Sequence, residues 1–246
     1  MQFHLFIFCV FLVTSLQAQS AIEVWYTSPV QKADGEFAGS STRYRLQCDP
    51  HYSLFVSQHS GSSMDYDEET QQFAMDFGGG ANWLYKDNVR QLLTNYVTSF
   101  QERHFIIEDG LHPIQWKILP DKKLIGEITV QKARGEFRGR TYSAWFARSI
   151  PLSNGPWKLG GLPGLILEAY DDDKLVVFLF HSIRPLQQKS IAMPESREAK
   201  ITLPAFQKLF EDEVNQYFDF LNARLRKEGS NVTYTTGDFE LWEYPE

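Results

Sequence analysis

The histidines of this chain are not accompanied by any sequence motif of a known catalytic mechanism. Its 246 residues contain no Gly-x-Ser-x-Gly, no His-Glu-x-x-His and no phosphate-binding loop, the patterns from which sequence alone predicts a mechanism. His181 directly follows an apolar run at residues 175–180, and His104 lies in a polar stretch. Either imidazole is a candidate general base beside a carboxylate. An exported hydrolase of unrecognised type is therefore an alternative function, but no residue is assigned as catalytic.

Metal chemistry has little support in the sequence. Cys48 and His51 lie three residues apart, whereas a stable zinc site needs three or four protein ligands. The acidic segment at residues 61–70 lacks the alternating ligands, central glycine and terminal glutamate of a calcium loop, and it is predicted to be a solvated loop. We expect Cys48 to be structural, and we predict no metal and no other cofactor.

Arg140, Tyr142 and Trp145 combine a cation with aromatic rings on one alternating segment. On a strand, Arg140 and Tyr142 share one face and Trp145 lies on the other. The guanidinium of Arg140 could bind a carboxylate or phosphate of a ligand, or it could pair with Glu127 or Glu136 across a hairpin. The pairing is favoured, and both alternatives stay open.

Composition narrows the classes of protein. The net charge is −7 without any Lys/Arg-rich run, which disfavours nucleic-acid binding. Apolar residues make up 43% of the chain and aromatic residues 15%, which is typical of a folded core rather than a disordered chain.

The N-terminal residues have the composition of a secretory signal peptide. An uncharged apolar run at residues 3–16 precedes Leu16-Gln17-Ala18, a small-residue pattern typical of a signal peptidase cut. The run is shorter than the roughly 20 apolar residues of a membrane span. Residues 1–18 are therefore predicted to be a signal peptide, and residues 19–246 a single β-rich domain without a transmembrane span. The expected location is the periplasm or the cell exterior, and loss of Cys9 leaves Cys48 without a disulfide partner.

The hydrophobic patterns predict a mainly β (α+β) chain. Short alternating segments continue to about residue 184, and a period of three to four follows. We predict a curved antiparallel sheet or half-barrel with one long C-terminal amphipathic helix at residues 202–228, capped by Thr202 and ended by Gly229. The helix is expected to pack against the sheet. Predicted strands cover residues 21–26, 42–47, 53–58, 97–107, 114–119, 165–170, 174–183 and 231–242, while 87–98 is ambiguous between helix and strand.

Two further patterns concern local structure. Residues 30–39 and 130–139 are identical at eight of ten positions, and both are predicted to be hairpin connections. Residues 175–180 are apolar at every position, which implies a strand covered on both faces. The cover is either the late helix together with a loop, or a cavity for an apolar ligand.

A Pro/Gly-rich segment at residues 155–164 is predicted to be a loop of defined shape over the sheet. It contains Gly155-Pro156-Trp157-Lys158 and Gly161-Leu162-Pro163-Gly164-Leu165-Ile166, and it follows Lys132-Ala133, Gly139-Arg140, Ala144-Trp145 and Ile150-Pro151. This order of motifs resembles the GLPGLI family of exported Bacteroidota proteins. The resemblance implies export and a β-rich chain but no activity.

The leading hypothesis is a non-enzymatic binding or carrier module of the cell envelope. Its target would be an apolar small molecule or an outer-membrane protein. The alternatives are the hydrolase and a structural envelope component without a ligand. The expected binding surface consists of Arg140, Tyr142, Trp145, Pro156, Trp157, Lys158, Leu162 and Pro163.

Overall fold

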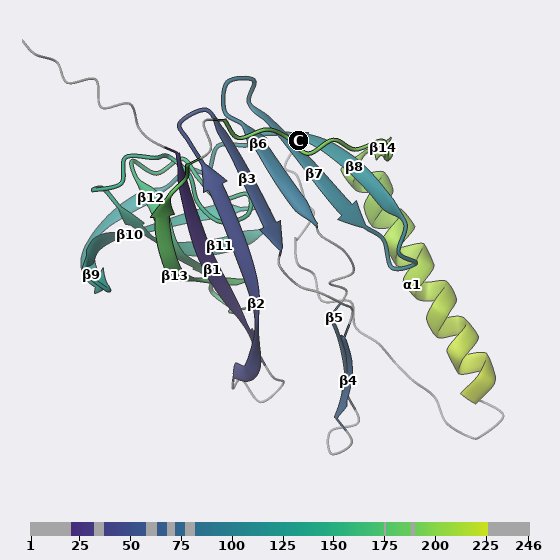
Figure 1. Ribbon diagram of the computed structural model, residues 1–246. Coiled ribbons are helices and arrows are strands. Elements are labelled where there is room, and N and C mark those ends of the chain that lie inside the picture. Colours follow the sequence, from purple (N-terminus) through teal and green to yellow (C-terminus); the bar gives the residue numbers. More distant parts are fainter. Residues whose placement is uncertain are drawn as a thin grey trace, which may run out of the picture.

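A computed structural model describes residues 21–31, 37–57, 63–67, 72–76, 82–174, 176–187 and 190–225. Within these residues the chain forms one open sheet of twelve strands in the order β14-β8-β7-β6-β3-β2-β1-β13-β12-β11-β10-β9. Every pairing is antiparallel except that of β14 with β8. The predicted mainly β fold with a curved, unclosed sheet and a single long C-terminal helix is confirmed. Figure 1 shows this arrangement.

The first half of the sheet is built from consecutive hairpins. Its alternating burial follows the alternating sequence, as in β3, where Ser53 and Phe55 are buried while Leu54 is only half-buried. The strands are β1 (Ile22–Gln31), β2 (Phe37–Cys48), β3 (Tyr52–Ser57), β6 (Trp83–Asp87), β7 (Leu92–Thr98) and β8 (His104–Gly110). A separate hairpin joins β4 (Ser63–Asp67) to β5 (Gln72–Asp76).

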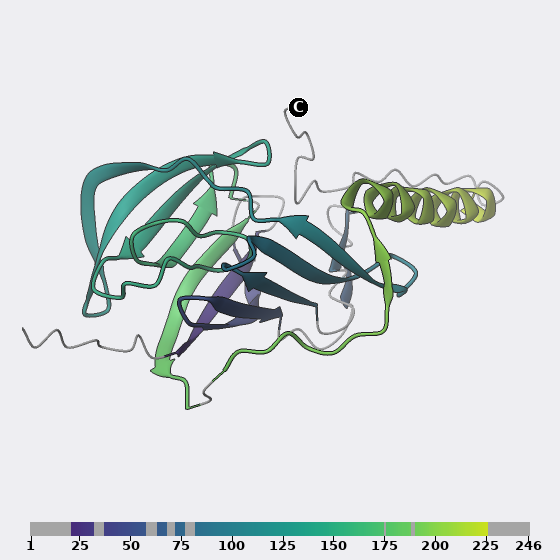
Figure 2. The same ribbon diagram turned by 90° about the horizontal axis from the view of Figure 1, so that it is seen from above.

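The second half of the sheet curls away from the first (Figure 2). It consists of β9 (Lys117–Ile125), β10 (Ile128–Phe137), β11 (Arg140–Ala147), β12 (Leu165–Asp171) and β13 (Val177–Pro185), and β14 (Ala199–Ile201) ends the opposite edge. The pairing registers shift between Gln131 and Ala133 and between Trp145 and Phe146. Such irregularities bend strands and increase their twist. Both irregularities lie in this curved half of the sheet.

The core lies between the two halves of the sheet. A single cluster of buried side chains includes Val24 and Leu46 from the first half and Ala144 and Phe146 from the second. The loop between β11 and β12 adds Leu152, Leu159 and Leu162 to the same cluster. The loop is therefore an internal part of the fold and not only a cover on it.

The helix α1 (Leu203–Leu225) begins where the sequence predicts. The amide of Phe206 donates to the carbonyl of Thr202, and that of Ala205 lies 3.4 Å from the Thr202 hydroxyl, so Thr202 caps the helix. The predicted end at Gly229 lies outside the described residues. Among the described residues, no helix combines the length and the apolar character needed to cross a membrane.

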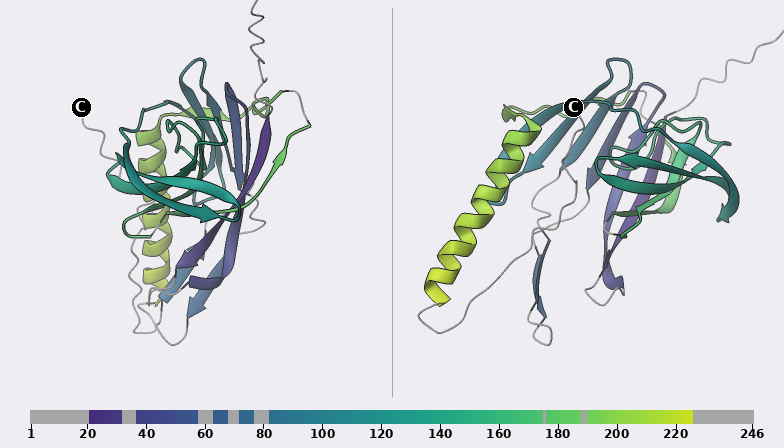
Figure 3. Two further views of the ribbon diagram at one scale, coloured as in Figure 1. Left: turned by 90° about the vertical axis from the view of Figure 1, so that its left-hand side faces the viewer. Right: turned by 180° about the vertical axis from the view of Figure 1, so that it is seen from behind.

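The helix packs at one end of the sheet. Its aromatic rings contact Phe100, which precedes β8, and Phe105 on β8. Figure 1 and the right-hand view of Figure 3 place the helix far from β12 and β13. Arg103 forms an ion pair with the buried Glu213 of the helix. The expectation that helix and loop together cover residues 175–180 is therefore wrong, although Val177 and Phe178 are buried.

Several local predictions need correction. Residues 97–107 are not one strand, because Ser99 and Arg103 close a turn between β7 and β8. Residues 63–67 form β4 instead of a loop. The second copy of the repeated segment lies in β10 and turns only at Arg138 and Gly139, whereas the first spans the β1–β2 connection. The predicted signal peptide and the predicted strand at 231–242 lie outside the described residues.

Candidate functional site

A buried lysine of β6, which no sequence motif indicates, binds the loop between β11 and β12. Nζ of Lys86 on β6 donates to Oδ1 of Asn154 at 3.1 Å, to the carbonyl of Gly155 at 3.1 Å and to the carbonyl of Leu159 at 2.7 Å. Lys86 is only 3% exposed, and burial lowers its pKa to about 7. The sequence does carry one indication of this burial. Lys86 lies two residues after Leu84, so on a strand both side chains point to the face that packs inward.

Cys48 and Ser53 share a cross-strand row with Lys86. Cys48 pairs with Ser53, and Ser53 pairs with Lys86, so the three residues lie on one face of β2, β3 and β6. Burial raises the pKa of the Cys48 thiol to about 12. The thiol is therefore protonated at neutral pH and is a poor nucleophile and metal ligand. Within the described parts of the chain, no cluster of three or more histidine, cysteine or acidic side chains is placed to hold a metal.

Most of the predicted binding residues lie in the core. Tyr142 and Leu162 are each 1% exposed. Five of the eight predicted binding residues are buried, namely Arg140, Tyr142, Pro156, Lys158 and Leu162. Trp145 and Trp157 are half-buried, and Pro163 is exposed. A molecule that docks from outside can therefore reach only Pro163 and parts of the two indole rings.

Arg140 forms an internal ion pair, but not with the partners that the sequence suggested. Its Nη1 lies 2.9 Å from Oδ2 of Asp171 on the neighbouring strand β12, and both side chains are buried. Oδ1 of Asp171 accepts from the amide of Val176 at 2.9 Å. Pairing with Glu127 or Glu136 was thus the wrong choice of carboxylate, because the pairing of β11 with β12 brings the Asp171–Asp173 turn to Arg140.

Trp145 lies on the outer face of the second half of the sheet. Its cross-strand neighbours are Lys132 and Glu168. Nζ of Lys123 lies 4.6 Å from the centre of one of its rings, and that of Lys132 lies 5.8 Å away. Lys123 also forms an ion pair with Glu168. Trp145 is therefore covered by cations of its own chain.

Gly164 of the Gly161–Ile166 motif and Gly155 earlier in the same loop are required by close packing. A Cβ atom at Gly164, where φ is +152°, would lie 2.2 Å from the carbonyl oxygen of Ala147. At Gly155 it would lie 2.8 Å from Cβ of Ile166. Both contacts are shorter than any real Cβ contact, so the segment owes these glycines to its backbone path through the core.

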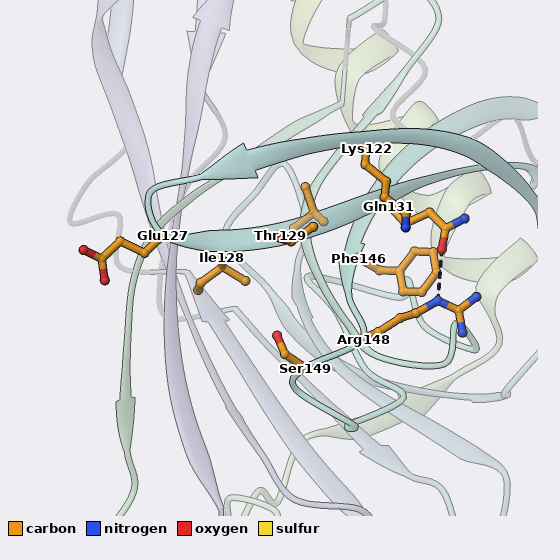
Figure 4. A pocket seen from close by; sticks show the side chains of 9 residues that line it. Lys122, Glu127, Ile128, Thr129, Gln131, Phe146, Arg148 and Ser149 are labelled. Carbon is orange, nitrogen blue, oxygen red and sulfur yellow. Dashed lines mark hydrogen bonds between the residues drawn. The ribbon is translucent and has the colours of Figure 1, made fainter.

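A groove opens at the end of β10 and β11, on the side of the sheet that carries the core residue Phe146. It has a volume of about 450 Å³. Figure 4 shows its lining, which comes from β9, the β9–β10 turn, β10, the end of β11, and the turn at residues 147–150 that begins the loop. The lining residues are Lys122, Glu127, Ile128, Thr129, Val130, Gln131, Phe146, Arg148 and Ser149.

Gln131 organises the polar end of this groove. Its Nε2 donates to the carbonyl of Leu119 at 2.7 Å, and its Oε1 accepts from Nε of Arg148 at 2.9 Å. Lys122 lies directly opposite Gln131 on β9. Glu127 lies at the other end of the groove, with its side chain directed away from Arg148 (Figure 4). None of the eight residues predicted to bind lines this groove, although Phe146 and Arg148 closely follow Trp145 in the sequence.

The two histidines considered as general bases do not contact a carboxylate in the described part of the chain. Nδ1 of His104 lies 3.2 Å from Oγ1 of Thr98, and its ring stacks on Tyr96. His181 is exposed on β13. A third histidine, His112, was not among the predicted bases, and its Nε2 lies 3.2 Å from Oδ1 of Asp109. Asp109 also forms an ion pair with Arg138 from the β10–β11 turn, so it joins the two halves of the sheet.

Known proteins resemble this chain in fold and in one segment of the sequence. None of the curated proteins matches this sequence. Two solved structures, "Structure of PNGF-II in P21 space group" and "Structure of PNGF-II in C2 space group", are similar with TM-scores of 0.54 and 0.53 and 13% sequence identity. Each alignment covers 78% of this chain but only 33% and 32% of the other, so this chain spans about a third of the length of those proteins. A family described as "Protein of unknown function (Porph_ging)" matches residues 136–168. The segment from the end of β10 to β12, with the Gly161–Ile166 motif inside it, is therefore similar to a protein family whose function is unknown.

Proposed function

We propose that this chain is an exported binding or carrier module of the GLPGLI type, located in the periplasm or outside the cell, which holds a largely apolar small molecule in the groove beside β10. One observation carries the proposal. The groove is lined by apolar and polar residues, and of the apolar ones Ile128 is half-buried and open to a ligand, whereas Val130 and Phe146 are buried behind the surface of the groove. Ligand sites in proteins are concave, mostly apolar and roughly 300–1,000 Å³ in volume, and a groove of about 450 Å³ falls within this range.

The apolar surface continues beyond the groove along β9. Leu124 lies directly opposite Thr129 and is 66% exposed. Exposed apolar side chains beside a concave site favour an apolar ligand. The other version of the proposal, an outer-membrane protein docked on the loop, has less support because the loop offers mainly Pro163 and part of Trp157 to a partner.

The test is native mass spectrometry of the mature chain purified from an envelope fraction, followed by denaturation to release any bound molecule. We expect a discrete additional mass. Ser149→Trp should remove it, because Ser149 lines the groove and a large ring would fill the space. Ser153→Trp is the matched control, since Ser153 is also an exposed serine of the same loop but does not line the groove. A clean apo mass in all three proteins would contradict the proposal and favour a structural envelope component.

A further inference from the structure

We infer that the ligand of the groove is an amphipathic anion, whose acidic head group is held by Lys122 and Arg148 while its apolar part lies against Ile128 and the exposed Leu124 beside the groove. This inference rests on the proposed function and adds the chemical class of the ligand. It follows from the way in which the charges around the groove are placed.

Arg148 is fixed in position before any ligand arrives. Its Nε donates to Gln131 at 2.9 Å, and its guanidinium carbon lies 5.4 Å from the centre of the Phe146 ring. Gln131 is itself held by the carbonyl of Leu119. The turn closed by the amide of Ile150 and the carbonyl of Ala147 places Arg148 at the start of the loop. A cation that is already ordered loses less conformational entropy when it binds an anion.

Lys122 brings a second cation to the same end of the groove. It pairs across the strands with Gln131, the residue that also binds Arg148. Neither Lys122 nor Arg148 forms an ion pair with a carboxylate in the described part of the chain, whereas Lys123 pairs with Glu168 and Arg134 with Asp172. The carboxylate of Glu127, also in the lining, lies at the opposite end (Figure 4).

The remaining lining residues suit an apolar chain below this head group. Ile128 supplies accessible apolar surface, which Leu124 continues along β9, and the exposed residues Thr129 and Ser149 add hydroxyl groups. A neutral apolar molecule would leave two cations beside an apolar surface without a counter-charge. A carboxylate, phosphate or sulfate at one end of an alkyl chain satisfies both parts of the groove, because charge-assisted hydrogen bonds are about twice as strong as neutral ones.

The experiment compares chains of equal length with different head groups. Tetradecanoate, 1-tetradecanol and tetradecylamine are titrated into the mature chain, and acetate and inorganic phosphate test the head group alone. We expect tetradecanoate to bind about tenfold more tightly than the alcohol, with the amine weakest. The preference should shrink at high salt, because the rim of the groove is exposed to solvent. Acetate and phosphate should bind weakly, since they bury no apolar surface.

A double variant separates this inference from the proposed function. In Lys122→Ala/Arg148→Ala the preference for tetradecanoate over tetradecanol should disappear while tetradecanol still binds. Lys117→Ala/Arg197→Ala is the control, because both cations are exposed and lie outside the groove. Equal binding of acid and alcohol by the unmodified chain would overturn the head-group inference and leave the groove as an apolar site. Binding of acetate or phosphate as tight as that of tetradecanoate would also overturn it, because the site would then be one for small anions. Binding of none of the five probes would overturn both.

Discussion

The ammonium group of Lys86 lies 2.7 Å from the carbonyl oxygen of Leu159, inside the core and between the two halves of the sheet. The same nitrogen also binds Asn154 and Gly155, so all three donors of one side chain are used by one loop. The segment that contains the Gly161–Ile166 motif is thus fastened to β6, a strand far from it in the sequence. The Pro/Gly-rich composition of this segment is therefore explained by its packing in the core. The neighbouring groove remains as the exposed candidate site.

Replacement of the buried lysine should loosen this loop. Lys86→Met keeps the length of the side chain but leaves the carbonyls of Gly155 and Leu159 without this donor. Since the desolvation cost of the ammonium is also removed, we expect a net loss of about 1–3 kcal/mol in the free energy of unfolding. Urea denaturation measures it, and Lys117→Met on the exposed edge of β9 is the control. An unchanged midpoint for Lys86→Met would mean that the three hydrogen bonds contribute no net stability.

The pKa of Lys86 also predicts how stability changes with pH. Burial lowers the pKa from its ordinary value of 10.5 to about 7 in the folded chain. Between these values the unfolded chain binds a proton that the folded chain does not, so the free energy of unfolding rises with pH. This contribution is complete above pH 10.5 and is lost as the pH falls through about 7.

The measurement is urea denaturation from pH 6 to about 8, a window in which the thiol and phenols of the unfolded chain stay mostly protonated. The unmodified chain should gain stability across this window relative to Lys86→Met, in which the titrating group is missing. Parallel curves for the two proteins would show that Lys86 stays fully protonated, held by its three oxygen acceptors.

The sequence predicts those parts of the fold that depend on local periodicity. Alternation identifies β3 and β12 nearly to the residue but only the first part of β1, and the period of α1 together with the Thr202 cap identifies the start of the helix. Tertiary contacts decide what local patterns leave open. The break between β7 and β8 is one example, because it is fixed by hydrogen bonds between Ser99 and Arg103 and by the ion pair of Arg103 with Glu213.

The site is less predictable than the fold because burial is decided by long-range packing. Leu162 and Pro163 are neighbours in one loop, yet the first is in the core and the second is exposed. The groove residues Lys122, Gln131 and Arg148 come together only through strand pairing and one side-chain hydrogen bond. Nothing in their spacing along the sequence indicates this.

Substitution of Gly164 should be far more damaging than that of another glycine with positive φ. Gly126 has a φ of +57° and open space where a Cβ atom would be added, whereas at Gly164 the atom would lie 2.2 Å from a backbone oxygen. Gly126→Ala is expected to cost about 1–2 kcal/mol, the usual penalty of a left-handed conformation. Gly164→Ala must in addition displace the end of β11, so we expect it to unfold at a much lower temperature or to accumulate as insoluble protein. Thermal unfolding followed by circular dichroism compares the two, and equal melting temperatures would contradict the packing argument.

The buried pair of Arg140 and Asp171 predicts strong non-additivity. Asp171→Asn keeps the oxygen that accepts from Val176 but leaves the guanidinium without its closest counter-charge, and Arg140→Met leaves a buried carboxylate. Each single variant is expected to lose about 3–5 kcal/mol, the usual cost of removing one partner of a buried ion pair. The double variant Arg140→Met/Asp171→Asn contains neither charge, so it should be more stable than either single variant.

The measurement is the free energy of unfolding of all four proteins in urea, with Arg134→Met/Asp172→Asn as a second cycle. Arg134 of β10 and Asp172 of the turn after β12 form an exposed pair, for which the coupling should be no more than about 1 kcal/mol. Equal coupling in both cycles would show that burial of Arg140 and Asp171 adds nothing to their interaction.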